Sequence, residues 1–349
     1  MPVFKPEYLV DVGSQIFAAV GSPPEEARIV AGLLVEANLV GHDSHGIIRI
    51  PQYMGSIEQG EIVPGAEVEI VRETAVAAVL DGHWGYGQMV GSRAAEMGLA
   101  KAREAGLAAI TIRNSNHVAR LGSYVDEIAR QEMIGMLFTN AHGGGASVVP
   151  WGGTRGRLGT NPLAVGIPRS SGEPLVLDMT TSVVAEGKVR VKRNRGEQTP
   201  DGWIVDIEGR PTNDPNAFYG PPRGGILPFG GIAGHKGYGL GVAVDLLAGA
   251  LSGAGCTGSG TRIGNAALLM VLNVAQFTPL ETYYQQVDDF IDFVRSSPTA
   301  EGFDEILMPG EIELRQKEQR QKEGIFVEEE TWRQVVECGR KQGAVIEEG

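Results

Sequence analysis

The fold of this chain is best indicated by residues 107–139, LAAITIRNSNHVARLGSYVDEIARQEMIGMLFT. This stretch begins and ends with apolar runs, at 107–112 and 133–139, whose length and aliphatic content are typical of buried strands. Between them, residues 123–131 have the spacing of a helix. Residues 75–104 show the same order of an apolar run and a helical stretch. Strands that alternate with helices predict a mixed α/β sheet domain.

Further apolar runs at 175–178 and 266–274 extend this α/β region. Residues 189–235 lie between these two runs, are rich in Pro, Gly, Asn and Asp, and predict a long ordered excursion or lid. The two ends of the chain have helical patterns instead. Residues 1–40 predict two helices, separated by a break in which Ser22 and Glu25 form a capping box. Helical spacing returns near the C-terminus, and we expect these helices to pack on the N-terminal pair.

The charge and the cysteine content exclude several classes of protein. The formal net charge is −13, whereas binding to nucleic acid calls for surfaces rich in Lys and Arg. The two cysteines provide no framework of disulfides or paired ligands, so we expect a cytoplasmic protein with free thiols. The N-terminus lacks the pattern of a signal peptide, and no apolar stretch reaches the roughly 18 residues of a membrane span. We therefore expect that the protein is not exported and does not span a membrane.

Two of the six histidines stand among Gly, Ser and Asn residues: His45 in GHDSHGIIR and His117 in NSNH. Because an imidazole titrates near neutral pH, both are candidates to move a proton. Arg49 follows His45 at a short distance in the sequence, and its planar guanidinium is suited to hold a substrate carboxylate. Together they suggest chemistry on a small acid. The alternative is that each histidine only caps a turn or binds a buried carbonyl.

The sequence contains one formal match to the dinucleotide fingerprint, GAGCTG at residues 253–258. It follows a helical stretch and not a strand, so it predicts a helix end and no Rossmann site. Three other segments suit a nucleotide better, since they combine small residues with hydroxyl, amide or lysine groups: residues 157–162, 176–182 and 234–239. His42 and His45 lack a second cluster of ligands, so no metal site is predicted.

Five ordered segments resemble the type-2 malate/L-lactate dehydrogenase family: DSHG at 43–46 with Arg49, RNSNH at 113–117, LGTNP at 158–162, LDM at 177–179 and GHKGYGL at 234–240. The likeness extends from about residue 5 to about residue 340. The same family includes ureidoglycolate and sulfolactate dehydrogenases, diketogulonate reductase and piperideine-2-carboxylate reductase.

The resemblance implies a non-Rossmann fold. A nicotinamide-binding α/β domain at 69–279 is joined to a helical domain built from both chain ends, residues 1–68 with 280–349. The resemblance also implies a homodimer that binds NAD or NADP and a small carboxylate substrate.

The resemblance assigns roles to individual residues. His45 and His117 are implied to be acid/base or substrate contacts. Our own hypothesis for Asp178 is that it either orients His45 as part of the catalytic group or contacts only the cofactor. Arg49, Ser44 and Thr160 are expected to bind the substrate. The expected cofactor contacts are Asn161, Asp178, Met179, Thr180, Ser182, His235, Lys236, Pro309, Gly310 and Glu311.

The implied activity is hydride transfer between NAD(P) and a small 2-hydroxy/2-oxo acid of the malate or lactate type. One alternative within the family is a ketimine reductase, which reduces C=N beside a carboxylate. An alternative from another class is a catalytically silent protein that binds a nucleotide or an acid as a sensor. The presence of His45, His117 and Arg49 weighs against the sensor.

Overall fold

The computed structural model describes residues 2–144, 146–260 and 262–346. Its α-helices are α1 (Pro6–Ala19), α2 (Pro24–Leu39), α3 (Ile50–Glu58), α4 (Gly87–Ala105), α5 (Gly122–Arg130), α6 (Glu186–Asn194), α7 (Pro215–Tyr219), α8 (Gly234–Asp245), α9 (Leu280–Arg295), α10 (Glu311–Glu323) and α11 (Glu329–Lys341). A π-helical turn, Leu246–Ala250, prolongs α8. None of the helices among the described residues is long and apolar enough to cross a membrane.

A central sheet of the described residues has seven strands in the order β2-β3-β4-β11-β5-β6-β7. Their bounds are β2 (Glu69–Glu73), β3 (Ala77–Asp81), β4 (Leu107–Ser115), β5 (Met133–His142), β6 (Leu163–Ile167), β7 (Leu175–Met179) and β11 (Gly264–Asn273). Only β3 and β4 pair in parallel, and every other neighbouring pair is antiparallel. The prediction of a mixed α/β fold is confirmed, and the sheet is not the parallel sheet of a Rossmann domain.

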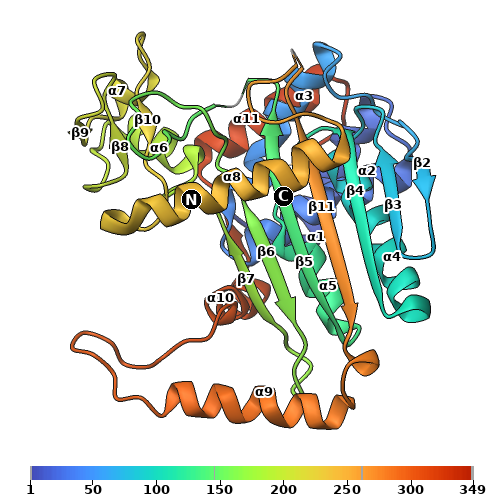
Figure 1. Ribbon diagram of the computed structural model, residues 1–349. Helices are drawn as coiled ribbons and strands as arrows, with labels where there is room; N and C mark the ends of the chain where they lie inside the picture. Colours follow the sequence, from blue (N-terminus) through green and yellow to red (C-terminus); the bar gives the residue numbers. More distant parts are fainter. Residues whose placement is uncertain (1, 145, 261, 347–349) are drawn as a thin grey trace.

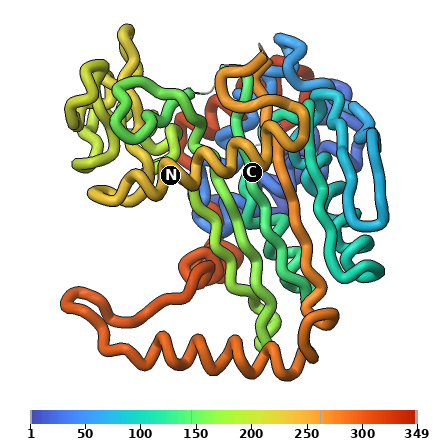
Figure 2. The backbone as a smooth tube through the Cα atoms, in the orientation of Figure 1, coloured from blue at the N-terminus to red at the C-terminus, as the bar shows by residue number. Residues whose placement is uncertain are grey.

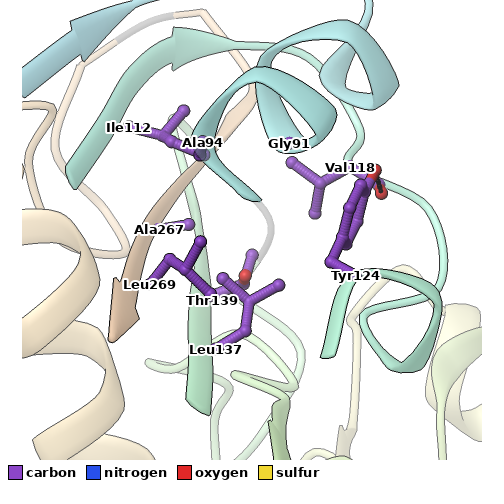
Figure 3. A pocket seen from close by; sticks show the side chains of 9 residues that line it. All are labelled: Gly91, Ala94, Ile112, Val118, Tyr124, Leu137, Thr139, Ala267 and Leu269. Carbon is purple, nitrogen blue, oxygen red and sulfur yellow. Dashed lines mark hydrogen bonds between the residues drawn. The ribbon is translucent and has the colours of Figure 1, made fainter. Parts of the chain in front are cut away.

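Helices cover both faces of this sheet (Figure 1). On one face, α4 packs on β4 and β11 while α5 packs on β5 and β6; α8 crosses the other face. The apolar runs recognised in the sequence supply the core between α4, α5 and the sheet, including Ile110, Ile112 and Leu137. A small apolar cavity remains inside this core, between Gly91, Tyr124 and Leu269 (Figure 3).

The helices at the two ends of the chain form a second core. Helix α11 packs on α1 and α3, and a short sheet of β1 (Val3–Phe4) and β12 (Ile325–Phe326) joins the two ends. The rings of Phe4 and Trp332 lie 4.2 Å apart between centroids. Helix α9 behaves differently: it runs past the end of the central sheet (Figure 2). Its residue Ile291 packs with Leu175 of β7. The division into domains at residues 69 and 279 stays a prediction.

The predicted capping box is wrong. Helix α2 begins at Pro24, and its N-cap residue Pro23 offers no side-chain hydrogen bond. The Ser22 hydroxyl lies 3.0 Å from the Tyr86 hydroxyl, because both side chains are buried between α2 and the start of α4. A buried tertiary partner thus replaces the local cap.

Residues 189–235 are more structured than a lid. Together with the residues just before them they form α6, α7 and a small sheet of β8 (Ile204–Val205), β9 (Pro211–Thr212) and β10 (Gly225–Ile226). Val189, Phe218 and Ile226 belong to a separate hydrophobic core. These few apolar residues are widely spaced in a polar sequence, so their periodicity was too weak to predict the elements.

Candidate active site

The two candidate histidines lie side by side in the structure. Their ring centroids are 5.6 Å apart and their planes differ by 24°. His45 lies in a pair of short 3-10 turns, Asp43–His45 and Ile47–Arg49, that connect α2 to α3. His117 follows the end of β4, at a point where α4 begins with Gly87. A Cβ atom on Gly87 would lie 2.3 Å from the His117 carbonyl oxygen, so only glycine allows this approach of the two segments.

Hydrogen bonds fix both imidazole rings. The Ser44 hydroxyl lies 3.1 Å from His45 Nδ1, and the Tyr53 hydroxyl lies 2.8 Å from His117 Nδ1. Gln88 Nε2 donates to the same Tyr53 oxygen at 2.9 Å. Sequence reasoning missed Tyr53 and Gln88. Tyr53 stands one helical turn after Arg49, a spacing that could have indicated it, whereas Gln88 gave no such signal.

Arg49 is held beside His45 by its own contacts. Its Nε donates to the Ser44 carbonyl oxygen at 2.7 Å, and its Nη1 donates to Gln52 at 2.6 Å. Among the described residues Nη2 makes no hydrogen bond. The start of α6 also reaches this site, since a Cβ on Gly187 would lie 3.6 Å from Ser44 Cβ.

Both histidines are uncharged at neutral pH. Burial, followed by the positive charge of Arg49, lowers the pKa of His45 to about 3. Burial, Arg49 and His45 lower the pKa of His117 well below its usual value. Lys188 of α6 adds to the positive field at His45. The site therefore combines neutral imidazoles with cationic side chains, an arrangement that favours an anionic ligand.

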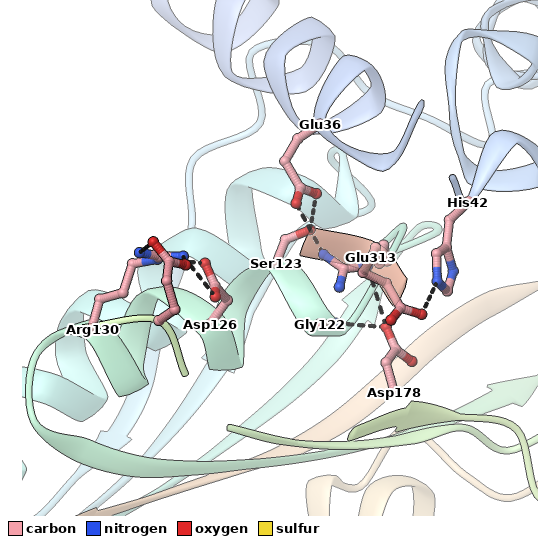
Figure 4. A network of polar contacts seen from close by, with 10 residues as sticks. Glu36, His42, Gly122, Ser123, Asp126, Arg130, Asp178 and Glu313 are labelled. Carbon is pink, nitrogen blue, oxygen red and sulfur yellow. Dashed lines mark hydrogen bonds and ion pairs between the residues drawn. The ribbon is translucent and has the colours of Figure 1, made fainter. Parts of the chain in front are cut away.

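Asp178 belongs to a neighbouring polar network (Figure 4). Among the described residues no hydrogen bond or ion pair connects it to His45. Its Oδ2 accepts a hydrogen bond from the Gly122 amide at 2.7 Å and lies 3.8 Å from Arg120 Nε. Arg120 in turn pairs with Glu36 at 2.9 Å. Burial raises the pKa of Asp178, against the opposing effect of Arg120. The hypothesis that Asp178 orients His45 has no contact to support it.

A pocket lies beside this network, between α2, α5, β7 and α10. Arg120, Val176, Gly310 and Glu313 are among the residues that line it. Two of the predicted cofactor residues reach this region: the Pro309 carbonyl accepts from the Val176 amide at 3.2 Å, and Gly310 is the N-cap residue of α10. Glu311 is turned to its own loop and pairs with Arg295.

The remaining predicted residues lie elsewhere. Asn161 is fully buried, and its Nδ2 donates to Asp245 at 3.0 Å and to the Gly241 carbonyl at 2.9 Å. The Thr160 carbonyl accepts from the Thr181 amide. Three others follow or end β7: Met179 ends β7, the Thr180 hydroxyl donates to the Ser182 carbonyl, and the Ser182 hydroxyl donates to the Val184 carbonyl. His235 and Lys236 are exposed at the start of α8, and His235 packs edge-on against Trp151 at 5.8 Å.

The structure thus brings His45, His117, Arg49 and Ser44 together. Gly310 lines the neighbouring pocket, and Asp178 and Pro309 contact its lining residues Arg120 and Val176. No described hydrogen bond or ion pair connects His235 or Lys236 to the histidines. Among the described residues no group of three or more His, Cys, Asp or Glu could hold a metal ion. The functional roles of all these residues stay predictions.

Comparison with known proteins identifies the family. The family model of malate/L-lactate dehydrogenase matches residues 4–336. This chain belongs to that family. L-sulfolactate dehydrogenase of Methanocaldococcus jannaschii is 36% identical to the chain, and the match covers 99% of both sequences. The relatives are dehydrogenases, so the chain is an oxidoreductase.

Solved structures of similar proteins have the same fold. Malate dehydrogenase from Pyrococcus horikoshii superimposes with a TM-score of 0.89 at 31% identity, over 99% of this chain and 97% of that one. A delta1-piperideine-2-carboxylate reductase from Pseudomonas syringae superimposes with a TM-score of 0.85 at 29% identity, over 97% and 100%. One fold is therefore shared by a malate dehydrogenase and a reductase of a cyclic imine, so the fold alone does not select the substrate.

Proposed function

We propose that this family member catalyses NAD(P)-dependent hydride transfer to or from C2 of a small 2-hydroxy/2-oxo acid of the malate or lactate type. The observation that carries the proposal is the stacked pair His45 and His117, with Arg49 bonded to the residue that precedes His45. A carboxylate held by Arg49 has its neighbouring carbon and oxygen next to an imidazole. This is the arrangement that a 2-hydroxy acid dehydrogenase requires.

Each side chain has a defined task in this proposal. Arg49 already uses Nε and Nη1 for protein contacts, so Nη2 is the nitrogen available to a substrate carboxylate. The histidines are uncharged, so neither adds a positive charge that would trap the acid in the ground state. In the direction of oxidation one neutral imidazole accepts the hydroxyl proton as the hydride leaves C2, and in the direction of reduction the imidazolium returns that proton to the oxygen as the hydride arrives. Ser44 holds the His45 ring.

Arg120, Arg130 and Lys317 are the cationic side chains of the Arg120 pocket that would contact a dinucleotide, and its lining also includes the carboxylates of Glu36, Asp126, Glu173 and Glu313. Arg120 Nε is buried without a hydrogen-bond partner in the described structure, and such a donor suits a phosphate oxygen. A Cβ on Gly122 would lie 2.5 Å from Arg120 Nη2, so glycine keeps this cradle open. Gly310 lines the same pocket and Asp178 contacts its lining residue Arg120, and these residues would hold the cofactor there. A nicotinamide bound beside them would accept or supply the hydride.

The test is an initial-rate assay with NADH and NADPH in turn on pyruvate, oxaloacetate and larger 2-oxo acids, each with and without methylamine. Turnover without amine supports the proposed dehydrogenase and names the cofactor. Turnover only with amine would assign the chain to ketimine reduction, the activity for which the Pseudomonas syringae relative is named. Cofactor binding with no turnover on any substrate would favour a silent sensor and contradict the proposal.

We also propose that the enzyme is a homodimer in the cytoplasm. Leu246, Leu247 and Leu251 at the end of α8 are 53%, 40% and 60% exposed, an apolar surface that a second copy would cover. Both Cys256 and Cys338 are free thiols, which agrees with a reducing compartment. Sedimentation velocity tests the dimer, and a single species of about 37 kDa would contradict it.

A further inference from the structure

A buried chain of hydrogen bonds leads from α4 to His117. Gln88 Nε2 donates to the Tyr53 hydroxyl oxygen at 2.9 Å, and that oxygen lies 2.8 Å from His117 Nδ1. Gln88 is 0% exposed and Tyr53 is 1% exposed, so water does not compete for these groups. The three side chains come from α4, α3 and the segment after β4, and only the fold brings them together.

The direction of each hydrogen bond follows from the atoms available. Gln88 provides an N–H to the Tyr53 oxygen, so this oxygen acts as an acceptor there. The single proton of the Tyr53 hydroxyl needs an acceptor of its own, and among the described residues His117 Nδ1 is the acceptor within reach. Nδ1 must then be unprotonated. A neutral imidazole with a bare Nδ1 carries its proton on Nε2.

The orientation of the Gln88 amide supports this direction. In the described structure Gln88 Oε1 is buried and has no hydrogen-bond partner. If the amide were reversed, Oε1 would accept from Tyr53 and the NH2 group would be the one left without a partner. The orientation drawn leaves Oε1 and one N–H unpaired, and the reversed one leaves both N–H groups unpaired, so each has two unpaired positions. The structure places Nε2, a donor, on the Tyr53 oxygen at 2.9 Å.

We propose that Tyr53 and Gln88 are positioning residues that hold His117 as the tautomer protonated on Nε2, so that His117 presents a hydrogen-bond donor to the substrate oxygen. His45 differs, because its Nδ1 partner is the Ser44 hydroxyl, which can either donate or accept. The two histidines are thus not equivalent: one has a fixed tautomer and the other does not. The donor role rests on the proposed function, whereas the tautomer does not.

The tautomer can be measured without any turnover. Long-range 1H–15N correlation spectra of protein labelled with 15N-histidine distinguish a protonated ring nitrogen from a bare one, and the chain has only six histidines. The His117 signals are assigned by their loss in His117→Gln. We expect a bare Nδ1 and a protonated Nε2 at neutral pH. A protonated Nδ1 would overturn the proposal, whatever substrate the enzyme uses.

Two variants test the positioning role. Tyr53→Phe removes only the hydroxyl, and we expect a mixture of tautomers at His117 with kcat lowered about tenfold and KM changed by less than about twofold. Gln88→Leu frees the Tyr53 oxygen to accept from Nδ1, and we expect the same change in the spectrum. The matched control is Tyr86→Phe, which removes another buried hydroxyl of this region but one bonded to Ser22.

The control should keep the wild-type His117 signals and the wild-type kcat. A folded Tyr53→Phe enzyme with unchanged signals and unchanged kcat would overturn the proposal. If either variant fails to fold, the spectrum of the unmodified protein still decides whether Nδ1 is bare. If the enzyme reduces no 2-oxo acid, the proposed function fails while the tautomer measurement stands.

Discussion

Replacing Gly46 with alanine tests whether the turn that carries His45 is held by packing. Gly46 has φ −85° and ψ −154°, so its backbone conformation is open to alanine. The obstacle is space: a Cβ on Gly46 would lie 2.1 Å from Asn38 Oδ1, far inside van der Waals contact. The Asn38 side chain, which is buried, must move to admit the methyl group.

The cost follows from what Asn38 does. Its Oδ1 accepts from the Ile47 amide at 2.9 Å, and its Nδ2 donates to Asp43 at 2.7 Å. These two hydrogen bonds fix the turn on both sides of Ser44 and His45. Losing both, at about 1 kcal/mol each, and leaving a buried amide unpaired, at about 1–2 kcal/mol, gives a destabilisation of about 3–4 kcal/mol. A displaced His45 should also lower kcat/KM at least tenfold if the proposed site is correct.

Urea unfolding followed by circular dichroism measures the first effect, and the 2-oxo acid assay measures the second. Gly32→Ala is the matched control, because Gly32 lies within α2 and a Cβ there meets nothing within 4 Å. This variant should be stabilised by about 0.5–1 kcal/mol through helix propensity, with unchanged activity. A Gly46→Ala protein as stable as Gly32→Ala would refute the reasoning.

Three other predictions concern the charges of the site. Arg49→Lys should lower kcat/KM about a hundredfold, with most of the loss in KM, because an ammonium cannot keep the Ser44 contact and bind a carboxylate in plane; steady-state kinetics that match the wild type would contradict this. His45 has its pKa lowered to about 3, so between pH 6.5 and pH 3 the unfolded chain binds a proton that the folded chain does not, and stability falls as the pH drops. Between pH 7 and pH 4.5 the free energy of unfolding of His45→Gln should therefore fall by about 2 kcal/mol less than that of the wild type in urea titrations. An equal fall in both proteins would argue against the lowered pKa. Lys188→Met should lower kcat/KM for oxaloacetate about tenfold more than kcat/KM for pyruvate, because Lys188 adds positive charge near His45. An unchanged ratio of the two kcat/KM values would exclude a role of Lys188 in binding a second anionic group.

The positions of some candidate site residues relative to one another could be predicted from the sequence. His45 and Arg49 lie on one short segment, so their proximity is a local property that spacing reveals. His117 was indicated by its NSNH setting and by the family resemblance, but its position beside them depends on the fold. The sequence also predicted correctly that GAGCTG at 253–258 is not a dinucleotide-binding turn, because these glycines follow a helix and not a strand.

Other site residues could not be placed in this way. Asn161 belongs to the segment LGTNP that resembles the family, yet its side chain is buried and donates a hydrogen bond to Asp245. The same segment is therefore as consistent with a structural hydrogen bond as with a contact to a ligand. Asp178 was a plausible partner for His45, but the Gly122 amide and Arg120 surround it instead. The sequence alone does not predict which of several hydrogen-bond donors a buried carboxylate will contact in the folded protein.

Sequence patterns were enough to predict the α/β character of the middle of the chain, the helical ends and the candidates His45, His117 and Arg49, because periodicity, composition and spacing are properties of neighbouring residues. The tertiary structure alone decided that α11 joins the N-terminal helices while α9 packs on β7. It also decided that Tyr53 and Gln88 stand behind His117. These hydrogen bonds connect residues that lie 35 and 64 positions apart in the sequence. They form because buried polar groups must be hydrogen-bonded in the folded state, and only the tertiary packing places suitable partners within reach.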